Sequence, residues 1–506
     1  MPGRVSIACI VLCGCGRLAF DDLADAPSSE VSAVTLSYPT ENLIAVQNTS
    51  SISLTPTVTG GPVAFSVTPA LPAGLVLAPT TGTITGTPTA EANRTSYVVT
   101  ASNSSGSASV TLYASIAPGY VVDTTADGLD DDGGVDATCF STAAAGCSLR
   151  AAVQTANRRT TPQLVLLGAN TYTIGGALED VANGLVIAGV GSAQTIVRAP
   201  TLHAGYQFAK LASQHTLSVM DLRVDGFGSV NGGAIAVLMG ELYVDECDFQ
   251  NNDSAGSGGV LFINGAAHAL LEHSTFENNT SFGGCCGGWG GVIDGEGSAT
   301  TVIVRTSTAV GNSTGWGSFA HITTGTTLTL ENSTLYGNMS TISGTLASPG
   351  GVYTLTNDTI AYNTNTNTSV NGSDLPSAGI YLYNPPSGYT LTNVILAHNT
   401  MTTGAERSCS HRVVGTTVTT KGGNVVTDDA YNCGVDFTAT TDRLTTEPGL
   451  DPAAPASHGG ETPTMLLVPG SPSIDTGVND GCPATDQRGV PRPIGPQCDV
   501  GAVEME

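Results

Sequence analysis

Two short stretches of the sequence carry charged residues of the kind that cleave polysaccharides. MDLRVDG contains Asp221, Arg223 and Asp225, and VIDGEG contains Asp294 and Glu296. An inverting glycoside hydrolase uses two carboxyl groups with room for a water between them, whereas a lyase places Ca²⁺-binding Asp residues beside an Arg or Lys base. These residues are the candidate catalytic groups. We favour the alternative that each is an outward residue of a repeat or an acid in a turn.

The densest group of carboxylates lies in the stretch DTTADGLDDDGGVD. Close-set acids on a glycine-containing loop supply oxygen ligands for Ca²⁺, which tolerates irregular geometry. The candidate ligands are Asp123, Asp127, Asp130, Asp131, Asp132 and Asp136. The Gly and the final Glu that an EF-hand loop requires are missing. Two interpretations stay open, a calcium site and a solvated acidic loop, and we favour the loop.

The two tryptophans of the chain, Trp289 and Trp316, are candidates for stacking on sugar rings. Trp289 lies in the glycine-rich segment GGCCGGWGG, residues 283–291. The alternative, which we favour, is that this segment is a loop folded over the edge of a repeat. The His residues lack metal-ligand spacing, and no GxSxG or Cys/His nucleophile arrangement occurs.

The composition predicts the elements that must position these residues. Gly occurs 63 times, and charged residues make up only 11% of the 506 residues. Thr, Ser, Val and Asn suit strands joined by tight turns, so we expect an all-β protein with several domains or an elongated repeat. The formal net charge of −26 argues against nucleic acid as a partner.

A nine-residue phrase, LENSTLYGN in one copy, recurs along the chain. Its copies end at Asn252, Asn279, Asn312, Asn338, Asn363 and Asn399. The spacings between these residues are 27, 33, 26, 25 and 36, and the residues eight and three positions before each Asn are apolar. Six positions before the final Asn stands a polar residue, which is Glu246, His273, Thr306, Asn332, Asn357 or Asn393.

This period predicts a solenoid whose turns stack. The LxxLxL core of leucine-rich repeats is absent, and Thr, Gly and Asn leave no room for a helix in each turn. In a parallel β-helix the inward apolar residues form a continuous core, and an Asn at the bend bonds to the next coil in a ladder. We expect a right-handed parallel β-helix over residues 164–440, with about eight or nine coils.

Residues 33–116 show strand signals separated by turns and predict a small β-sandwich. The stretch LPAGLVLAPTTGTITGTPTAEANRTSYVVTASNSSGSASVTL resembles the Ig-like, cadherin-like module of bacterial surface proteins. The turns at 81–84 and 86–88 and the strand at 97–101 stand where that family places them. The resemblance implies a spacer or a binding unit, and we expect a spacer.

An open solenoid needs a cap at each end. For the first cap, residues 119–163, we expect a helix that begins at the N-cap Ser148. Its sequence resembles the CSLRxAI…AN signature that precedes β-helices in exported bacterial proteins, with Ala151 where Glu is usual and Val153 for Ile.

The second cap is expected at residues 441–506, over the far end of the solenoid. This region contains PGLDP, HGGETPTMLLVPGSPSIDTG, DQRG and CDVGAVE. On these motifs it resembles the carboxy-terminal region of the choice-of-anchor Q β-helix proteins, whose members vary in how they reach the surface.

The amino-terminal residues read as a targeting segment. Arg4 precedes a short apolar run, residues 5–12, which is too short to span a membrane. The following LCGC resembles the bacterial lipobox, which implies a signal peptide at 1–14, lipidation of Cys15 and a linker at 15–32. By this resemblance the chain is exported and held by its lipid, at the outer membrane or cell surface. An ordinary signal peptide is the alternative.

In an exported chain, cysteines form disulfides more often than metal sites. Local spacing suggests the pairs Cys139 with Cys147, Cys409 with Cys433, and Cys482 with Cys498. Three cysteines remain. Either Cys285 and Cys286 bond to each other and Cys247 stays free, or Cys247 takes one of them.

The fold that we predict is all-β, with a small Ig-like β-sandwich before a right-handed parallel β-helix that has an N-terminal helix cap. We expect a monomer that acts without catalysis, in adhesion or in binding a polysaccharide or a surface protein, with Ca²⁺ as the one candidate cofactor. The alternative is a polysaccharide lyase or glycoside hydrolase on the same scaffold. The NTD, GHG and RIK elements of polygalacturonases are absent, as are the pectate lyase signatures.

Overall fold

The computed structural model describes most residues after the linker. The described residues are 33–505 without 62, 284–286, 369–375, 384–387, 412–416, 428–436 and 438. The predicted signal peptide, linker and lipidation site Cys15 lie outside them, as do Cys285, Cys286 and Cys433. Strands dominate the described part of the chain, and its one helix is short, so the all-β prediction is confirmed. That helix is neither long nor apolar enough to cross a membrane.

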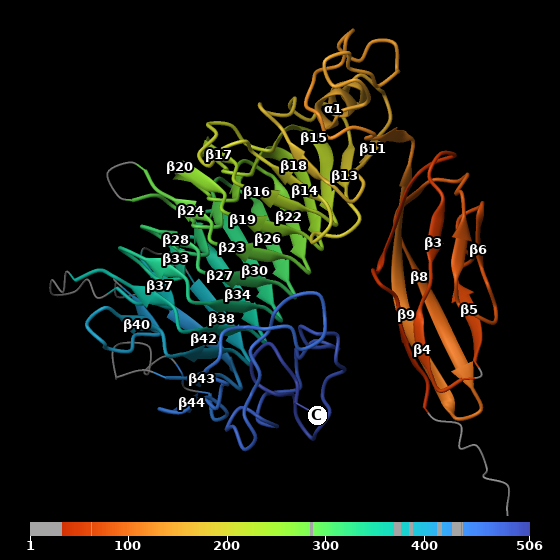
Figure 1. The fold of residues 1–506 in the computed structure, drawn as a ribbon. Coiled ribbons are helices and arrows are strands. Elements are labelled where there is room, and N and C mark those ends of the chain that lie inside the picture. The colour runs from red at the N-terminus through yellow and green to blue at the C-terminus, as the bar shows by residue number, and fades with distance from the viewer. Residues whose placement is uncertain are drawn as a thin grey trace, which may run out of the picture.

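The first module is the predicted Ig-like β-sandwich (Figure 1). Its larger sheet has the order β2 (Asn42–Val46), β9 (Gly106–Ala117), β8 (Ala92–Asn103) and β5 (Ala64–Thr68). The other strands are β3 (Ile52–Leu54), β7 (Ile84–Gly86) and β6 (Leu75–Leu77) in one sheet, and the pair β1 (Thr35–Ser37) and β4 (Thr57–Thr59). Alternate residues of β9, namely Leu112, Ala114 and Ile116, are buried in the core, which is the period-two pattern of a half-buried strand.

A helix closes the entrance of the solenoid, as predicted. Helix α1 (Leu149–Asn157) begins after Ser148, whose Oγ accepts a hydrogen bond from the backbone N of Ala151 at 3.1 Å. This bond satisfies one of the N–H groups that the first turn of a helix leaves without a partner. The apolar face of the helix, which includes Val153, packs on the solenoid core.

The solenoid consists of three parallel sheets, and strands of consecutive coils pair in each (Figure 1). The first sheet contains β10 (Gly119–Val121), β11 (Gln163–Leu166), β13 (Leu185–Ala188), β15 (Ala209–Met220), β18 (Ile235–Asp245), β21 (Leu261–Ile263), β22 (His268–Glu272), β25 (Ile293–Gly295), β26 (Thr300–Arg305), β29 (Ala320–Ile322), β30 (Thr326–Glu331), β33 (Leu346–Ser348), β34 (Val352–Thr356), β37 (Ile380–Leu382), β38 (Gly388–Thr392), β41 (Cys409–His411) and β42 (Thr417–Gly422).

Two narrower sheets complete each coil. The second sheet contains β12 (Thr171–Thr173), β14 (Ile196–Arg198), β16 (Arg223–Asp225), β19 (Asp248–Gln250), β23 (Thr275–Glu277), β27 (Thr308–Val310), β31 (Thr334–Tyr336), β35 (Thr359–Ala361), β39 (Ile395–Ala397), β43 (Val425–Val426) and β44 (Arg443–Leu444). The third contains β17 (Gly228–Asn231), β20 (Asp253–Ser257), β24 (Thr280–Ser281), β28 (Ser313–Thr314), β32 (Met339–Ser340), β36 (Thr364–Asn365) and β40 (Thr400–Met401).

The final Asn of each repeated phrase belongs to a buried ladder. In one rung, the backbone N and Nδ2 of Asn279 donate to Oδ1 of Asn312 at 2.9 and 3.0 Å, and Nδ2 also donates to the carbonyl of Phe249 at 2.9 Å. The same pattern joins Asn252, Asn279, Asn312, Asn338, Asn363 and Asn399. Because these amides are fully buried, the ladder satisfies polar groups that would otherwise oppose burial. The predicted Asn ladder is confirmed.

The C-terminal segment, residues 445–505, runs along the outer face of the second sheet, whereas we expected it over the far end of the solenoid. Figure 1 shows it in dark blue beside the late coils. The reason is apolar surface, because Ile395 and Ala397 are buried outside the coil and pack with Leu450, Leu467 and Val500 of the segment. The outer wall of the second sheet therefore needs a cover.

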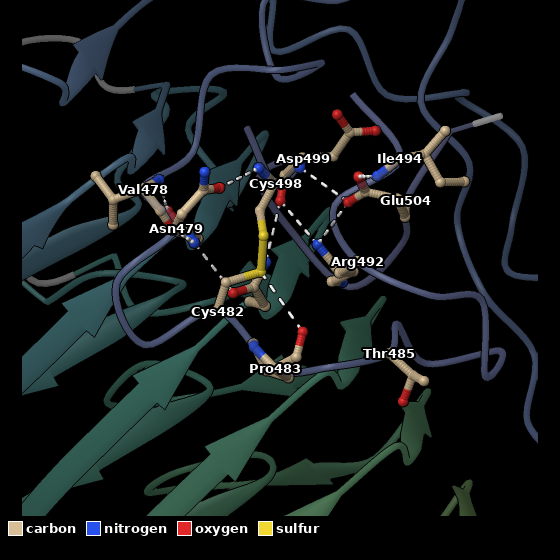
Figure 2. The surroundings of a disulfide bond; sticks show 12 residues. Val478, Asn479, Cys482, Pro483, Thr485, Arg492, Ile494, Cys498, Asp499 and Glu504 are labelled. Carbon is tan, nitrogen blue, oxygen red and sulfur yellow. Dashed lines mark hydrogen bonds and ion pairs between the residues drawn. A yellow bond between two sulfur atoms is a disulfide. The ribbon is translucent and has the colours of Figure 1, made fainter. Parts of the chain in front are cut away.

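The DQRG and CDVGAVE motifs hold this segment together and fix it to the solenoid. Figure 2 shows Arg492, which donates to the carbonyl of Asp499 at 2.8 Å and pairs with Glu504 at 3.2 Å. The side chain of Gln487 lies against the solenoid, where its Nε2 donates to Thr308 Oγ1 at 2.8 Å. DQRG and CDVGAVE thus supply structural contacts.

Candidate functional site

A hollow of about 310 Å³ opens on the outer wall of the solenoid, and we call it the wall hollow. Its lining residues are Trp289, Glu296, Trp316, His321, Thr323, Pro349 and Tyr383. This volume lies at the lower end of the range of small-molecule sites, and aromatic walls with a few polar groups are typical of such sites.

Neighbouring strands of the first sheet place an acid and a histidine at the wall hollow. Asp294 is the central residue of β25, His321 is the central residue of β29, and the two stand directly opposite each other in register. The residues beside His321, Ala320 and Ile322, belong to the core. Because side chains alternate along a strand, Asp294 and His321 point to the outer face of the sheet.

Two tryptophans stand at matching places of consecutive coils. Trp289 and Trp316 form a parallel bridge with each other, and each side chain is half-buried. The ring of Trp316 meets the ring of Tyr383 edge-on, with 5.2 Å between the centroids. Backbone bonds fix the pair, since Gly290 N donates to Trp316 O at 2.8 Å. The indoles therefore occupy defined positions above the sheet.

Asp294 and His321 form a buried ion pair or hydrogen-bonded pair. Nδ1 of His321 lies 2.7 Å from Oδ1 of Asp294, and their side chains are 7% and 0% exposed. A carboxylate bonded to Nδ1 fixes the orientation of the imidazole ring. Oδ2 of Asp294 has no hydrogen-bond partner among the described residues. The pair thus presents a fixed histidine to the hollow.

Glu296 is the third ionisable group of the site. Burial raises the pKa of Glu296, the charge of Asp294 raises it further, and His321 lowers it. Glu296 therefore keeps its proton to a higher pH than an exposed Glu does. A protonated carboxyl donates a hydrogen bond, so Glu296 is suited to a hydroxyl or to a glycosidic oxygen.

The structure separates the charged residues of MDLRVDG. Asp221 is buried in a turn where the first module meets the solenoid. Arg223 and Asp225 lie on β16, where Arg223 pairs with Asp248 at 3.3 Å and Asp225 accepts from Nδ2 of Asn251 at 2.8 Å. Each residue has its own structural partner, so these three candidates form no common catalytic group.

The acids of DTTADGLDDDGGVD bond to their own part of the chain. Asp127 makes two bonds to Arg150, at 2.6 and 2.7 Å, and Asp130 accepts from the backbone N of Gly134 at 2.8 Å. The described ranges contain no group of three His, Cys, Asp or Glu side chains arranged to hold a metal ion. The candidates Asp123, Asp127, Asp130, Asp131, Asp132 and Asp136 form no such group among the described residues, and the calcium site stays a prediction.

Disulfides join two of the suggested cysteine pairs. Cys139 bonds to Cys147 and Cys482 to Cys498, with Cα separations of 5.1 and 6.6 Å. Cys409 is disulfide-bonded, and its suggested partner Cys433 lies outside the described residues. Cys247 is free and buried.

Four residues of this region, Asp294, Glu296, Trp289 and Trp316, were candidates by residue type, but their sequence positions did not predict that they share one hollow. His321 and Tyr383 were not among the candidates. One signal was available, because Trp316 follows Trp289 by 27 residues and His321 follows Asp294 by the same 27. A shared offset of one coil length predicts that both pairs stack in register.

Comparisons with known proteins identify the first module. The family model described as "Putative Ig domain" matches residues 30–117. No curated protein matches the chain.

Solved structures resemble the solenoid only distantly. Pectin methylesterase from carrot is 14% identical over 53% of this chain and 83% of its own, with a TM-score of 0.31. The catalytic domain of a GH87 alpha-1,3-glucanase in complex with nigerose is 10% identical over 69% of this chain and 76% of its own, with a TM-score of 0.26. At these scores the likeness carries no argument about activity or substrate.

Proposed function

We propose that this protein is an exported, monomeric surface protein that binds neutral glycans in the wall hollow. The observation that carries this proposal is the placement of Trp289 and Trp316 on consecutive coils beside the buried pair of Asp294 and His321. Indole faces pack on the apolar faces of sugar rings, and the polar groups between them bond to hydroxyls.

Charge selects neutral glycans over acidic ones. The hollow is lined by Glu296 and His321 and by no Lys or Arg, as far as the described residues go. The whole chain carries a formal charge of −26, which repels polyuronates and sulfated chains. A polysaccharide without charged groups meets no such repulsion.

Glycan binding is tested by titrating the purified full chain with neutral and acidic oligosaccharides in a calorimeter. Trp289→Ala and Trp316→Ala are each expected to weaken binding of a neutral oligosaccharide about fivefold, since an aromatic contact of this kind contributes about 1 kcal/mol. Phe140→Ala removes an exposed aromatic ring elsewhere and serves as the matched control. Equal binding by all three variants would refute the site.

A second candidate function, hydrolysis of the bound glycan, is favoured by the raised pKa of Glu296 beside a fixed histidine. Neutral His321 would take a proton from water as the water oxygen bonds to the anomeric carbon. Glu296 would give its proton to the leaving oxygen as the glycosidic bond breaks, and solvent would restore both groups.

Appearance of new reducing ends on incubation with a neutral polysaccharide decides between binding alone and hydrolysis. If the chain hydrolyses its ligand, Glu296→Gln should abolish the new ends and leave affinity within about threefold, because only the proton is lost. Absence of new ends with the native chain would leave binding as the function.

Export and anchoring at Cys15 are part of the same proposal and rest on the lipobox-like LCGC, which lies outside the described residues. The likeness of the C-terminal motifs to choice-of-anchor Q proteins supports a surface location. Labelling of expressing bacteria with a radioactive fatty acid should mark the chain and should fail for Cys15→Ser. Labelling of the Cys15→Ser chain would place the lipid elsewhere.

A further inference from the structure

In seven consecutive coils, the turn between the first and second sheets has a left-handed residue, and these residues form what we call the turn row. Its members are Asp221, Glu246, His273, Thr306, Asn332, Asn357 and Asn393, with φ between 46° and 54°. Asn, Asp and His adopt this conformation more readily than other residues with side chains. The polar position of the repeated phrase therefore has a backbone cause.

The late part of the turn row binds the C-terminal segment. Nδ2 of Asn332 donates to the carbonyl of Thr485 at 2.7 Å, and Nδ2 of Asn357 donates to that of Asp499 at 3.0 Å. Nδ2 of Asn393 likewise donates to the carbonyl of Val478, at 2.9 Å. Each of these bonds joins an uncharged amide to a backbone carbonyl.

The early part of the turn row binds the Ig-like module instead. Asn42, on β2, is buried, and its Nδ2 donates to carboxylate oxygens of Asp221 at 3.1 Å, Asp245 at 3.2 Å and Glu246 at 3.2 Å. One amide nitrogen thus meets three carboxyl groups of the solenoid. Thr40 also donates to Glu246, at 3.3 Å.

Arg94, on β8, completes the junction. Its guanidinium lies 3.4 Å from Asp245 and 3.0 Å from Glu272, and it stacks on the rings of Tyr113 and Tyr243. This cation joins side chains from both modules. Ion pairs and ring contacts of this kind fix orientation as well as adding energy.

Acids outnumber cations around this junction. The acids that face it are Asp221, Asp245, Glu246 and Glu272 from the solenoid, Glu41 from the Ig-like module and Glu461 from the C-terminal segment. The cations are Arg94 and His273, together with Arg305, which lies 3.4 Å from Glu272. Fully ionised, the buried groups would repel one another at an energetic cost.

Burial at the junction favours the protonated forms of Asp221 and Glu246 when the modules are docked, because it raises the pKa of both carboxyl groups. Burial raises the pKa of Glu246 to about 10, with the charge of Asp221 as the next cause, and burial raises the pKa of Asp221 to about 7. The Glu246 carboxyl donates a hydrogen bond to Asp221. Burial lowers the pKa of His273, but its bond to Asp245 at 2.8 Å raises the pKa overall.

A one-residue connection and a cleft lie between the two modules. β9 ends at Ala117 and β10 begins at Gly119, so Pro118 alone connects them. A cleft of about 770 Å³ lies between the modules, and Arg94 and Tyr243 line it. Beside the acids, Val46 of the Ig-like module packs on Leu164 and Met220 of the first sheet, which gives an attraction independent of pH.

We propose that the early turn row is a proton-dependent latch, which holds the Ig-like module on the solenoid at acidic pH and releases it at alkaline pH. Release frees Asp221 and Glu246 to ionise in water, where their ordinary pKa values are near 4. Docking of the Ig-like module is therefore coupled to proton uptake by these two carboxyl groups. Docking is strongest at a pH below the pKa values that Asp221 and Glu246 have in the separated modules. It weakens as the pH rises through the higher pKa values that they have in the docked state.

Small-angle X-ray scattering of the purified full chain between pH 5 and pH 9 tests the latch. The radius of gyration is expected to increase as the pH rises from 5 to 9. The double variant Asp221→Asn, Glu246→Gln removes the two turn-row carboxyl groups of the latch and should stay compact to pH 9. Asn at 221 suits the left-handed turn, with φ 54°.

The matched control, Asp225→Asn with Asp248→Asn, removes two charges on β16 and β19 outside the junction and should open as the native chain does. Asn42→Asp adds a carboxyl to the latch and should shift opening to lower pH by at least one unit. Circular dichroism at pH 5 verifies that each variant folds. A native radius that is constant to pH 9, or equal opening of the native chain and the latch double variant, would overturn the proposal.

Discussion

The early and late parts of the turn row share one backbone conformation and differ in their chemistry. Asn332, Asn357 and Asn393 donate amide protons to backbone carbonyls of the C-terminal segment. Asp221 and Glu246, at the same place in earlier coils, both accept a hydrogen bond from Nδ2 of Asn42 in the Ig-like module. An amide does not titrate in the physiological range, whereas carboxyl groups and imidazoles do. The bonds of the late turn row therefore involve no titratable side chain, whereas those of the early turn row do.

Within the turn row, Asp221 and Glu246 face the Ig-like module, whereas Asn332 and Asn357 face the C-terminal segment. A left-handed turn asks only for a residue that tolerates positive φ, and Asn meets that requirement best among polar residues. Where the solenoid carries Glu246 or His273 instead, the turn faces a module attached through one residue, Pro118. In the latch that we propose, these charged turn residues make attachment of the Ig-like module depend on pH.

The largest expected effect comes from breaking the late contact at its buried ion pair. Arg492 and Glu504 are 0% and 1% exposed, and Arg492 also bonds to the carbonyl of Gly501 at 2.8 Å. Arg492→Ala leaves the buried carboxylate of Glu504 without its ion-pair partner, although the backbone N–H groups of Ile494 and Asp499 still bond to it, and should lower the free energy of unfolding by about 3 to 5 kcal/mol. Urea unfolding followed by circular dichroism measures it. Arg198→Ala, at an exposed site on β14, is the control, and a loss below about 1 kcal/mol for Arg492→Ala would contradict the prediction.

A smaller effect is expected from a single late member of the turn row. Asn357→Ala removes the bond to Asp499 and places Ala at φ 53°, so it should cost about 2 kcal/mol. Asn357→Gly keeps the conformation and loses only the side-chain bonds, so it should cost about 1 kcal/mol. The same urea experiment compares them. An equal cost for the two variants would show that backbone conformation contributes nothing.

At the early contact, His273→Asn should give an effect that depends on pH. The pKa of His273 is raised in the folded chain, so its bond to Asp245 stabilises the fold fully at a pH below the unfolded-state pKa, which is near 6.5. This stabilisation is lost as the pH rises through the pKa of His273 in the folded chain. Calorimetric unfolding should show the variant less stable by about 1 kcal/mol at pH 5 and equal to the native chain at pH 9. A difference that does not change with pH would exclude titration of His273.

The fold could be predicted from the sequence because a repeated residue pattern directly indicates stacked coils. The six ladder Asn residues, the apolar positions around them and the cap at Ser148 each have a local cause in bend geometry, core burial or helix capping. The contacts across the chain were not accessible. Asn42 and Asp221 are 179 residues apart, and no local pattern reports that their side chains meet.

Only part of the candidate site could be predicted from the sequence, for the same reason. Asp294, Glu296 and the two tryptophans attracted attention by residue type, but stacking of irregular coils decides which of them share a hollow. Tyr383 joins from a later coil, through a ring contact with Trp316 that has no sequence signature. The path of the C-terminal segment depended on outward apolar residues such as Ile395, which periodicity alone places on a strand without telling what covers them.

The smallest expected effect lies at Thr306, between the two parts of the turn row. Its φ is 46°, a conformation that a β-branched side chain adopts at a cost, while its carbonyl accepts a hydrogen bond from Thr462 of the C-terminal segment at 2.9 Å. Thr306→Asn keeps that carbonyl and relieves the turn, so it should raise the free energy of unfolding by about 0.5 to 1 kcal/mol at both pH 5 and pH 9. Thr308→Asn, on the adjoining strand, has no such turn to relieve and should be destabilising. If Thr306→Asn lowers stability, the hydroxyl rather than the backbone determines the residue at this turn, and the early and late parts differ by more than their charge.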